Sequence, residues 1–309
     1  MMELIRGLHN LRAHHRGGAA TIGSFDGVHL GHQAVFDQLQ RAAEQRNLPA
    51  TVVTFEPQPR EFFRPEASPP RLTRLREKLQ AMSGCAVRRV LCLRFDAPLA
   101  SLTAGDFVRQ ILAEGLGIRY LLVGDDFRFG RDRAGNFALL QEAGEQHGFE
   151  VEAMDTFSVG VGRVSSTRVR EMLTAGDLER AGELLGRPYT LCGRIAHGDK
   201  RGRTIGFPTA NIHLFRSKSP LTGVFAVEMG WSGNRLHQGV ANIGYRPTVG
   251  GTRLQLEVHL FDFDEDIYGR HVEVEFLHKL REEQRFASFD ALREQILRDA
   301  AEARAFFLR

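Results

Sequence analysis

The pattern of apolar residues changes at Gly186-Arg187-Pro188, and this change restricts the fold more than any other feature of the sequence. Before it, predicted helices alternate with predicted strands, which favours a parallel sheet joined by right-handed crossovers. After it, short alternating strands are separated by glycine turns, as in a small antiparallel barrel. The end of the chain, residues 288–307, has apolar side chains on one face of a helix. We therefore expect two domains, residues 1–185 and residues 186–309.

Within the first domain, the sequence predicts strands and helices in regular order. The prolines of residues 56–71 predict a long loop without regular structure at the carboxyl end of a strand, where α/β sheets usually bind ligands. A helix start is predicted at residues 165–173, capped by Ser166 or Thr167. The other predicted elements are a strand (19–23), a helix (33–47), a strand (50–55), a basic helix (71–82), a strand (87–95), a helix (103–115), a strand (120–123), and a helix followed by a strand (137–155).

The stretch TIGSFDGVHLGHQAVFDQLQ, residues 21–40, joins the end of a strand to a helix through a glycine turn. Such a junction binds anions, because unpaired backbone N–H groups and the helix dipole point at the ligand. His29 and His32 have three interpretations: metal ligands that need a third partner, capping or core histidines, or donors to phosphate oxygens. We favour phosphate binding, with Gly31 allowing a nucleotide to approach the backbone.

Composition excludes several classes of protein. The chain has 309 residues, 42% of them hydrophobic and 26% charged, as expected of a soluble globular protein. It contains no apolar run long enough to span a membrane and no secretory signal, so we expect a cytoplasmic protein. Its three cysteines show no CxxC spacing and are expected to be reduced. A net charge of +3 suits an anionic substrate but is low for a dedicated nucleic-acid binder.

Two segments of the first domain resemble the signatures of the nucleotidylyltransferase superfamily. GSFDGVHLGH resembles its HxGH motif, and SSTRVR, residues 165–170, resembles its ISSTxIR motif. The resemblance implies a Rossmann-like fold in which both motifs bind ATP. It implies catalytic roles for His29, His32 and Arg168, and ATP-binding roles for Gly23, Phe25, Asp26, Gly31, Ser165, Ser166 and Thr167.

From residue 21 to residue 307 the chain is similar to the bacterial bifunctional riboflavin kinase/FAD synthetase family. In the first domain, TFEPQPREFF and GDDFRFG match segments of that family. The sequence departs from the family pattern at Glu56, usually Asp, and at Gln58, usually His. In the second domain the matching segments are GRTIGFPTANI, LTGVFAV, GVANIGYRPT and LEVHLFDFDEDIYG.

For the first domain, the resemblance implies transfer of AMP from ATP to FMN, which forms FAD and releases pyrophosphate. The FMN phosphate is already ionised at neutral pH, so catalysis needs positioning and charge stabilisation more than a base. Phe62 and Phe63 would be walls for the flavin ring, although one of them could be ordinary loop packing. Asp126 would orient ribose or flavin, although it could belong to a plain turn. The residues assigned to flavin are Pro57, Phe62, Phe63, Asp126 and, in the second domain, Arg285.

For the second domain, the resemblance implies ATP-dependent phosphorylation of riboflavin to FMN, with Glu257 as the catalytic base. Alternation places Glu257 with Gln255 and His259 on the polar face of a strand; without the motif, such a glutamate would usually face solvent. Thr209 and Asn211 share one face of an extended segment and offer the oxygen ligands that Mg²⁺ prefers. No Walker loop is present, so residues 197–206 are expected to hold ATP, unless they are a solvated basic hairpin. The ATP-binding residues implied here are Lys200, Arg203, Gly206 and Asn242.

Three rival functions have weaker support. A nucleic-acid binder would need exposed aromatic residues on consecutive strands, and the acidic run DFDEDIYG would repel phosphate. An aminoacyl-tRNA synthetase shares a HIGH-like motif, but this chain lacks a KMSKS-like lysine loop. An enzyme with only one active half would lack required residues, and none is missing. We therefore expect small-molecule substrates (riboflavin, FMN and ATP) and neither nucleic acid nor membrane as a partner, and the sequence leaves a homo-oligomer open.

Overall fold

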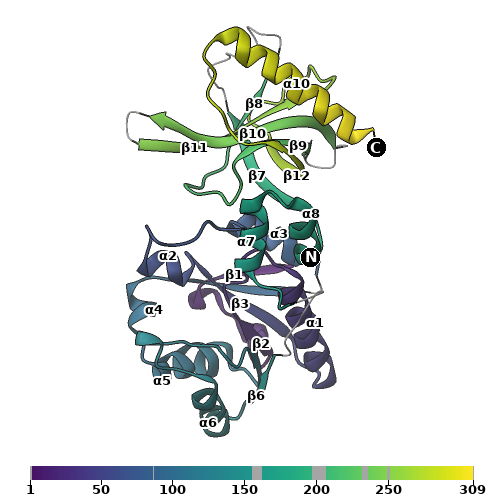
Figure 1. Ribbon diagram of the computed structural model, residues 1–309. Coiled ribbons are helices and arrows are strands. Elements are labelled where there is room, and N and C mark those ends of the chain that lie inside the picture. The colour runs from purple at the N-terminus through teal and green to yellow at the C-terminus, as the bar shows by residue number, and fades with distance from the viewer. Residues whose placement is uncertain are drawn as a thin grey trace. The chain divides into compact units, whose positions relative to one another are not determined.

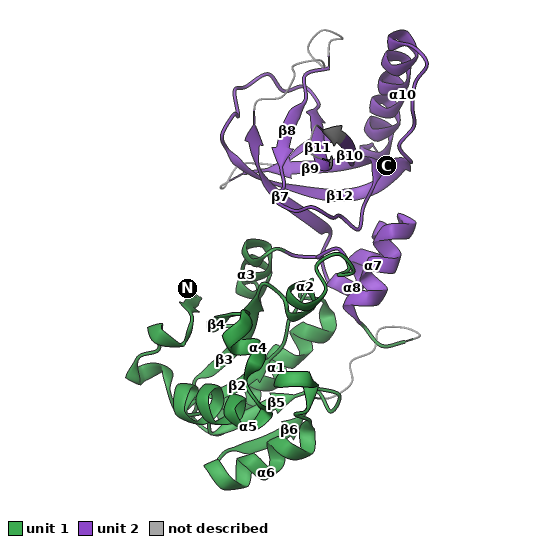
Figure 2. Ribbon diagram, turned by 90° about the vertical axis from the view of Figure 1, so that its left-hand side faces the viewer, with its two compact units in different colours: residues 1–69, 74–164 green, residues 70–73, 165–309 purple. Residues whose placement is uncertain are grey.

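The computed structural model describes residues 2–85, 87–154, 162–196, 207–231, 236–248 and 251–308. By their contacts these residues form two compact units, coloured separately in Figure 2. The first unit comprises residues 1–69 and 74–164. The second comprises residues 70–73 and 165–309. Residues 165–185 therefore pack with the second unit, although they precede the predicted boundary.

The first unit is a six-stranded sheet with helices on both faces. The strands are β1 (Glu3–Arg6), β2 (Ala19–Ile22), β3 (Ala50–Glu56), β4 (Arg89–Arg94), β5 (Tyr120–Val123) and β6 (Glu150–Ala153). The helices are η1 (Leu8–Asn10), η2 (Ala13–His15), α1 (Leu30–Gln45), α2 (Pro59–Phe63), α3 (Leu75–Ser83), α4 (Ala97–Ser101), α5 (Ala104–Phe107), η3 (Val108–Leu116), η4 (Arg131–Arg133) and α6 (Phe137–His147).

The strand order β1-β4-β3-β2-β5-β6 confirms the predicted parallel sheet, because every neighbouring pair is parallel. From β2 the chain builds outward through β3 and β4 on one side. It then returns to place β5 and β6 on the other side. The carboxyl end of β2 is therefore the topological switch point, where open α/β sheets bind their ligands.

Alternating side chains of the sheet fill two separate cores. Val52 and Val90 face a core that includes Phe36 of α1 and Met82 of α3. Their strand neighbours Val53 and Leu91 face the other core, which includes residues of η3 and α6. Because both faces are covered, the inner strands β2 and β5 are buried along their whole length, as is typical of parallel sheets.

Three features of this unit differ from the predictions. The segment predicted as loop contains the short helix α2, because Pro59 occupies its first turn, where the fixed φ of proline favours a helix. The predicted helix 103–115 is α-helical only over α5 and continues as the π-helical segment η3. Strand β1 was not expected; it pairs with β4 at the edge of the sheet.

The second unit is a closed barrel with helices before and after it, as Figure 1 shows. Its strand order is β10-β11-β8-β7-β12-β9, and all pairs are antiparallel, which confirms the predicted antiparallel barrel. The elements are α7 (Ser166–Ala175), α8 (Leu178–Leu185), β7 (Tyr189–Ala196), β8 (Ala210–His213), β9 (Gly223–Gly230), β10 (His237–Thr248), β11 (Gly251–Leu260), β12 (His271–Arg281) and α10 (Phe289–Phe307).

Helix α10 is the predicted C-terminal helix, and it packs along the barrel beside β9, β10 and β12. Ser288 caps it by accepting the N–H of Ala291. Arg281 of β12 makes two hydrogen bonds, of 2.8 and 2.6 Å, to the buried carboxylate of Asp299. This two-pronged ion pair holds the helix on the barrel. Among the residues that the structure describes, no helix is long and apolar enough to cross a membrane.

Residues 70–73 belong to the second unit through three hydrogen bonds to their carbonyl groups. Arg170 of α7 donates to Pro70 O at 2.7 Å. The Tyr189 hydroxyl of β7 donates to Leu72 O at 3.1 Å, and Arg216 donates to Arg71 O at 3.2 Å. A short segment from the first half of the chain is therefore built into the second unit.

Candidate active sites

The turn between β2 and α1 lies at the switch point and has an unusual backbone. Gly23 continues the sheet by donating its N–H to Val53 O at 3.0 Å. Phe25 and Val28 both have φ of 45°, and Gly27 has φ of 89°. A positive φ is costly for a β-branched residue such as Val28, so surrounding contacts must hold the turn in this shape. Asp26, between these residues, is buried.

His29 is the N-cap of α1. Its Nδ1 accepts the backbone N–H of His32 at 3.3 Å, so the ring proton of the neutral form lies on Nε2. The rings of His29 and His32 stack at a centroid distance of 3.6 Å. A Cβ atom on Gly31 would lie 3.2 Å from the His29 ring, so glycine is needed for this close approach. The capping interpretation thus holds for His29.

His32 is held neutral at neutral pH. Burial, the neighbouring His29 and the positive charge of Lys78 place its pKa well below the ordinary value of 6.5. The edge of the Phe25 ring packs against it at 5.3 Å. Its Nδ1 is buried and has no hydrogen-bond partner within the described ranges. A neutral imidazole can donate or accept one hydrogen bond at each nitrogen, so this atom can bind a ligand group.

Lys78 is a site residue that the sequence patterns did not reveal. It lies on α3 with no exposed surface, and its ammonium donates to Ser24 O in the turn at 2.6 Å. The Thr54 hydroxyl of β3 donates to the same carbonyl at 3.4 Å. Lysine is almost never fully buried, so the sequence of this basic helix predicts that the Lys78 side chain is solvated. Only the assembled sheet brings these three residues together.

The segment assigned to flavin carries exposed aromatic rings. Phe62 is 38% exposed and Phe63 is 62% exposed, and both are on α2. With Phe95, which follows β4, they form three edge-to-face pairs with centroid distances of 5.3 to 5.6 Å. Sequence patterns did not identify Phe95, because its neighbours come from a different part of the chain. These rings lie nearly perpendicular to one another, and the exposed ones offer an apolar surface.

The other residues assigned to flavin in this half, and Gln58, have structural partners. Pro57 lies between β3 and α2, and Gln58, the N-cap residue of α2, donates its backbone N–H to the Glu61 carboxylate at 3.0 Å. The side-chain nitrogen of Gln58 is buried without a partner in the part of the chain that is described. Asp126 lies in the turn after β5, where Arg163 is 3.8 Å from its carboxylate. The side chain of Asp126 is 69% exposed, so that ion pair is weak.

The second nucleotide motif begins α7, in the second unit. Ser165 caps the helix by accepting the N–H of Arg168 at 3.2 Å. The cap is therefore Ser165, and the prediction of Ser166 or Thr167 as the cap was wrong by one or two residues. Thr167 is exposed, and Nη1 of Arg168 is buried with no hydrogen-bond partner among the described residues. A buried guanidinium nitrogen of this kind is ready to bind an anion.

On the barrel, Asn242, Glu257 and Asn211 form one row across three strands. Asn242 of β10 is in register with Glu257 of β11, and Glu257 is in register with Asn211 of β8. Residues opposite each other in antiparallel strands point to the same face. The side-chain amide of Gln255 donates to both Asn211 Oδ1 and Glu257 Oε1 at 2.8 Å each. Sequence analysis placed Gln255 beside Glu257 but assigned it no role.

The buried and exposed residues of β11 alternate as predicted. Leu254, Leu256 and Val258 are buried in the barrel, whereas Gln255 and Glu257 are only partly buried. The amide oxygen of Asn211 and the hydroxyl of Thr209, two residues before it, are the kind of donors that suit Mg²⁺.

The structure gives fewer contacts for the other site residues predicted in the barrel half. In the amide orientation that satisfies both groups, Asn242 donates to Gly223 O at 3.3 Å and accepts from Arg246 at 3.2 Å. Arg285 is exposed between β12 and α10. Lys200, Arg203 and Gly206 lie outside the described residues.

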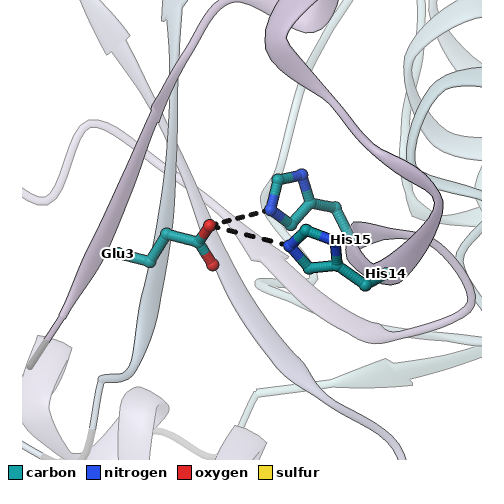
Figure 3. A group of neighbouring side chains, drawn as sticks. All are labelled: Glu3, His14 and His15. Carbon is teal, nitrogen blue, oxygen red and sulfur yellow. Dashed lines mark hydrogen bonds and ion pairs between the residues drawn. The ribbon is translucent and has the colours of Figure 1, made fainter.

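A cluster of Glu3, His14 and His15 has the composition of a metal site, with ligand atoms within 4.8 Å of one another (Figure 3). Its hydrogen bonds indicate a structural role instead. The N–H of Arg12 donates to His15 Nδ1, so His15 Nε2 carries the proton and donates to Glu3 at 2.9 Å. That nitrogen has no lone pair for a metal. Arg89 also lies 3.3 Å from the Glu3 carboxylate and would repel a cation.

Comparisons with known proteins divide the chain in the same order. A family model described as FAD synthetase matches residues 11–168, and one described as riboflavin kinase matches residues 185–307. The Escherichia coli (strain K12) bifunctional riboflavin kinase/FMN adenylyltransferase is 53% identical, over 99% of this chain and 98% of the relative. The enzyme of that name from Pseudomonas fluorescens is 54% identical, over 98% of this chain and 97% of the relative.

A solved structure has a similar fold over nearly the whole chain. It is titled as a macrolide-efflux protein from Streptococcus pneumoniae, is 30% identical, has a TM-score of 0.80 and covers 98% of both chains. High identity over full length and two matching family models therefore lead to one conclusion. The chain belongs to the bifunctional riboflavin kinase/FMN adenylyltransferase family, with an FAD synthetase domain followed by a riboflavin kinase domain.

Proposed function

We propose that this chain makes FAD from riboflavin in two ATP-dependent steps, with the barrel half acting first. The barrel half phosphorylates riboflavin to FMN, and the parallel-sheet half transfers AMP from ATP to FMN. The observation that carries this proposal is the row of Glu257 and Asn211 in register on the barrel. A carboxylate and an amide oxygen, joined by Gln255, combine a base and a cation ligand at one place.

In the kinase step, the 5′-hydroxyl of the ribityl chain attacks the γ-phosphorus of ATP. The new O–P bond forms as the bond to the β–γ bridging oxygen breaks, and ADP leaves. Glu257 accepts the proton of the attacking hydroxyl, which removes positive charge from the developing phosphate ester. Thr209 and Asn211 would hold Mg²⁺, which supplies positive charge to the phosphates when bound. Asn242 on the same row contacts the nucleotide, and Lys200, Arg203 and Gly206 contact its phosphates.

In the adenylyl transfer step, a phosphate oxygen of FMN attacks the α-phosphorus of ATP. The new P–O–P bridge forms, the bond to the leaving pyrophosphate breaks, and no proton has to be removed. His29 donates from Nε2, neutral His32 forms a hydrogen bond, and Arg168 supplies positive charge to the transition state. Gly23, Phe25, Asp26 and Gly31 hold the ATP phosphates and base, as do Ser165, Ser166 and Thr167. The switch-point position of the β2–α1 turn supports this assignment.

The flavin substrate of this half binds against the aromatic surface of α2. Phe62 and Phe63 are exposed, and Phe95 packs edge-to-face against both. The rings match the apolar, planar isoalloxazine. Pro57 and Asp126 are also assigned to this flavin, and Arg285 is assigned to flavin in the kinase half. Mg²⁺, a cytoplasmic location and the absence of nucleic-acid and membrane partners stay predictions from the sequence, and oligomeric state stays open.

One product analysis tests both activities. The purified protein is incubated with riboflavin, ATP and Mg²⁺, and flavins are separated over time. We expect FMN to appear first and FAD to follow, with ADP and pyrophosphate as co-products. FMN without FAD would contradict the assignment of the parallel-sheet half. Salt-sensitive RNA binding without flavin turnover would favour the rival class of nucleic-acid binders.

A further inference from the structure

A buried positive charge lies beside the β2–α1 turn. The side chain of Lys78 has no exposed surface, and its ammonium is 2.6 Å from Ser24 O and 3.5 Å from the Thr54 hydroxyl. Moving an ammonium out of water is costly unless hydrogen bonds or charges stabilise it. A methionine of similar length would fill the same space without that cost. The charge and its hydrogen bonds, rather than the volume, are therefore what the site requires.

The carbonyl that Lys78 binds belongs to the strained part of the turn. Ser24 directly precedes Phe25, whose φ is 45°. Strained backbone persists only where its surroundings determine it from several sides. Lys78 of α3 and Thr54 of β3 both donate to Ser24 O, and they come from two different elements. These two contacts fix the carbonyl and, through it, the path of the turn.

The charge of Lys78 also reaches the histidine pair. It is one of the causes that lower the pKa of His32, after burial and the neighbouring His29. Among the described residues, His29 and Lys78 are the charged groups that lower this pKa, and the buried carboxylate of Asp26 belongs to the same turn. A fixed positive charge in a water-poor site attracts phosphate groups and stabilises charge that develops on them.

We propose that Lys78 is a positioning residue of the adenylyl transfer step: it holds the β2–α1 turn in its phosphate-binding shape and provides a buried positive charge beneath it. The role rests on the proposed function of the parallel-sheet half. Lys78 acts through Ser24 and His32 and makes no contact with the reacting atoms.

The test is Lys78→Met in the full-length protein, assayed for both reactions. We expect kcat/KM for FMN adenylylation to fall about 100-fold, since a displacement of about 1 Å at a positioned site has that effect. Riboflavin phosphorylation should not change. The acidic limb of the pH profile for adenylylation should move to higher pH, because the pKa of His32 rises when a neighbouring positive charge is removed.

Two further variants separate positioning from simple stability. Met82→Ala lies on the same helix and is also fully buried, so it leaves a cavity without changing charge. It should lower the melting temperature and leave the pH profile in place. Lys78→Arg keeps the charge and should keep the wild-type pH profile even where its rate is lower.

The possible results separate the role of Lys78 from the proposed function of the parallel-sheet half. The role of Lys78 would be overturned if Lys78→Met kept its adenylylation activity. It would also be overturned if the pH profile of Lys78→Met matched that of Met82→Ala. If Lys78→Met does not fold, a shifted pH profile in Lys78→Arg would overturn it instead. A wild-type protein that makes no FAD from FMN and ATP would contradict the proposed function itself.

Discussion

Asn211 of β8 and Glu257 of β11 lie directly opposite each other, and one amide group, that of Gln255, donates to both at 2.8 Å. The register brings the proposed cation ligand and the proposed base together although they are distant in sequence. Because Gln255 is on the same strand face as Glu257, its amide fixes the orientation of both oxygens. The proposed base and the proposed cation ligand are therefore both held by strands of the barrel wall.

Glu257→Gln should abolish riboflavin phosphorylation and leave FMN adenylylation unchanged. Glutamine is the same size but cannot accept the hydroxyl proton, and general-base catalysis is worth about 10²–10⁴-fold in rate. Separate assays with riboflavin and with FMN measure the two reactions in one protein preparation. Equal losses in both assays would contradict two independent sites.

Substitutions of Gln255 test whether its amide positions Asn211 and Glu257. In Gln255→Ala both Asn211 and Glu257 lose a hydrogen bond, so kinase kcat/KM should fall about tenfold or more, since hydrogen bonds to charged groups are worth about 1.5–3 kcal/mol. Gln255→Glu places a carboxylate beside Glu257 and should lose more, despite its matching shape. Wild-type kinase rates in both variants would show that Gln255 does not position the base. FAD formation from FMN is the internal control.

Local patterns predicted much of this architecture, whereas contacts between distant segments could not be predicted. Alternation along β11 placed Glu257 and Gln255 on one face, and the structure confirms it. The pairing of Glu257 with Asn211 depends on strand register, which no local pattern specifies. The position of Lys78 on a basic helix predicts a solvated side chain. Its burial is explained by its hydrogen bonds to Ser24 and Thr54, which the folded sheet brings close to it.

His29 combines capping with its proposed catalytic role, and two substitutions separate them. His29→Ala removes both, so FAD formation should fall about 100-fold or more, and the loss of the cap should cost about 0.5–2 kcal/mol of stability. His29→Asn keeps a good N-cap but has no imidazole Nε2. Its melting temperature should be near wild type while FAD formation remains low. Restored FAD formation in His29→Asn would limit His29 to capping.

Glu275 of β12 faces Glu228 of β9 directly, and this pair should make stability pH-dependent. Burial, then Glu228 and Glu273, raise the pKa of Glu275 above its ordinary value of 4.5. The folded state therefore binds the proton more tightly than the unfolded chain does. The repulsion between these carboxylates is fully present at pH values above the pKa of Glu275 in the folded state. It weakens as the pH falls through that pKa and no longer lowers stability below the ordinary value of 4.5.

Glu275→Gln should accordingly raise the melting temperature at neutral pH. The gain should be about 0.2–1 kcal/mol, at the low end because solvent screens this partly exposed pair. It should disappear near about pH 4, where the wild-type carboxyl is protonated. Glu228→Gln is the matched control: it relieves the same pair, so the double variant should gain less than the sum of the two. Additive gains, or a gain that persists in acid, would contradict direct repulsion.

The barrel unit can be tested as an isolated fragment. The row of Asn211, Gln255 and Glu257 lies wholly within the barrel, so we expect residues 186–309 alone to retain kinase activity. That fragment lacks α8, which buries four apolar side chains and packs on β7 and β12. A fragment of residues 165–309 keeps α7 and α8, and its melting temperature should be higher by about 5 °C or more, since each kcal/mol is worth about 4–8 °C in a small domain.

Both fragments lack residues 70–73, whose carbonyl groups accept from Arg170, Tyr189 and Arg216 in the full chain. The fragments lose these hydrogen bonds, so even the longer fragment should be less stable than the same unit in the intact protein. Circular dichroism melts of the two fragments and of the full-length protein measure this order of stability. A folded but inactive 165–309 fragment would show that the kinase site needs the parallel-sheet half.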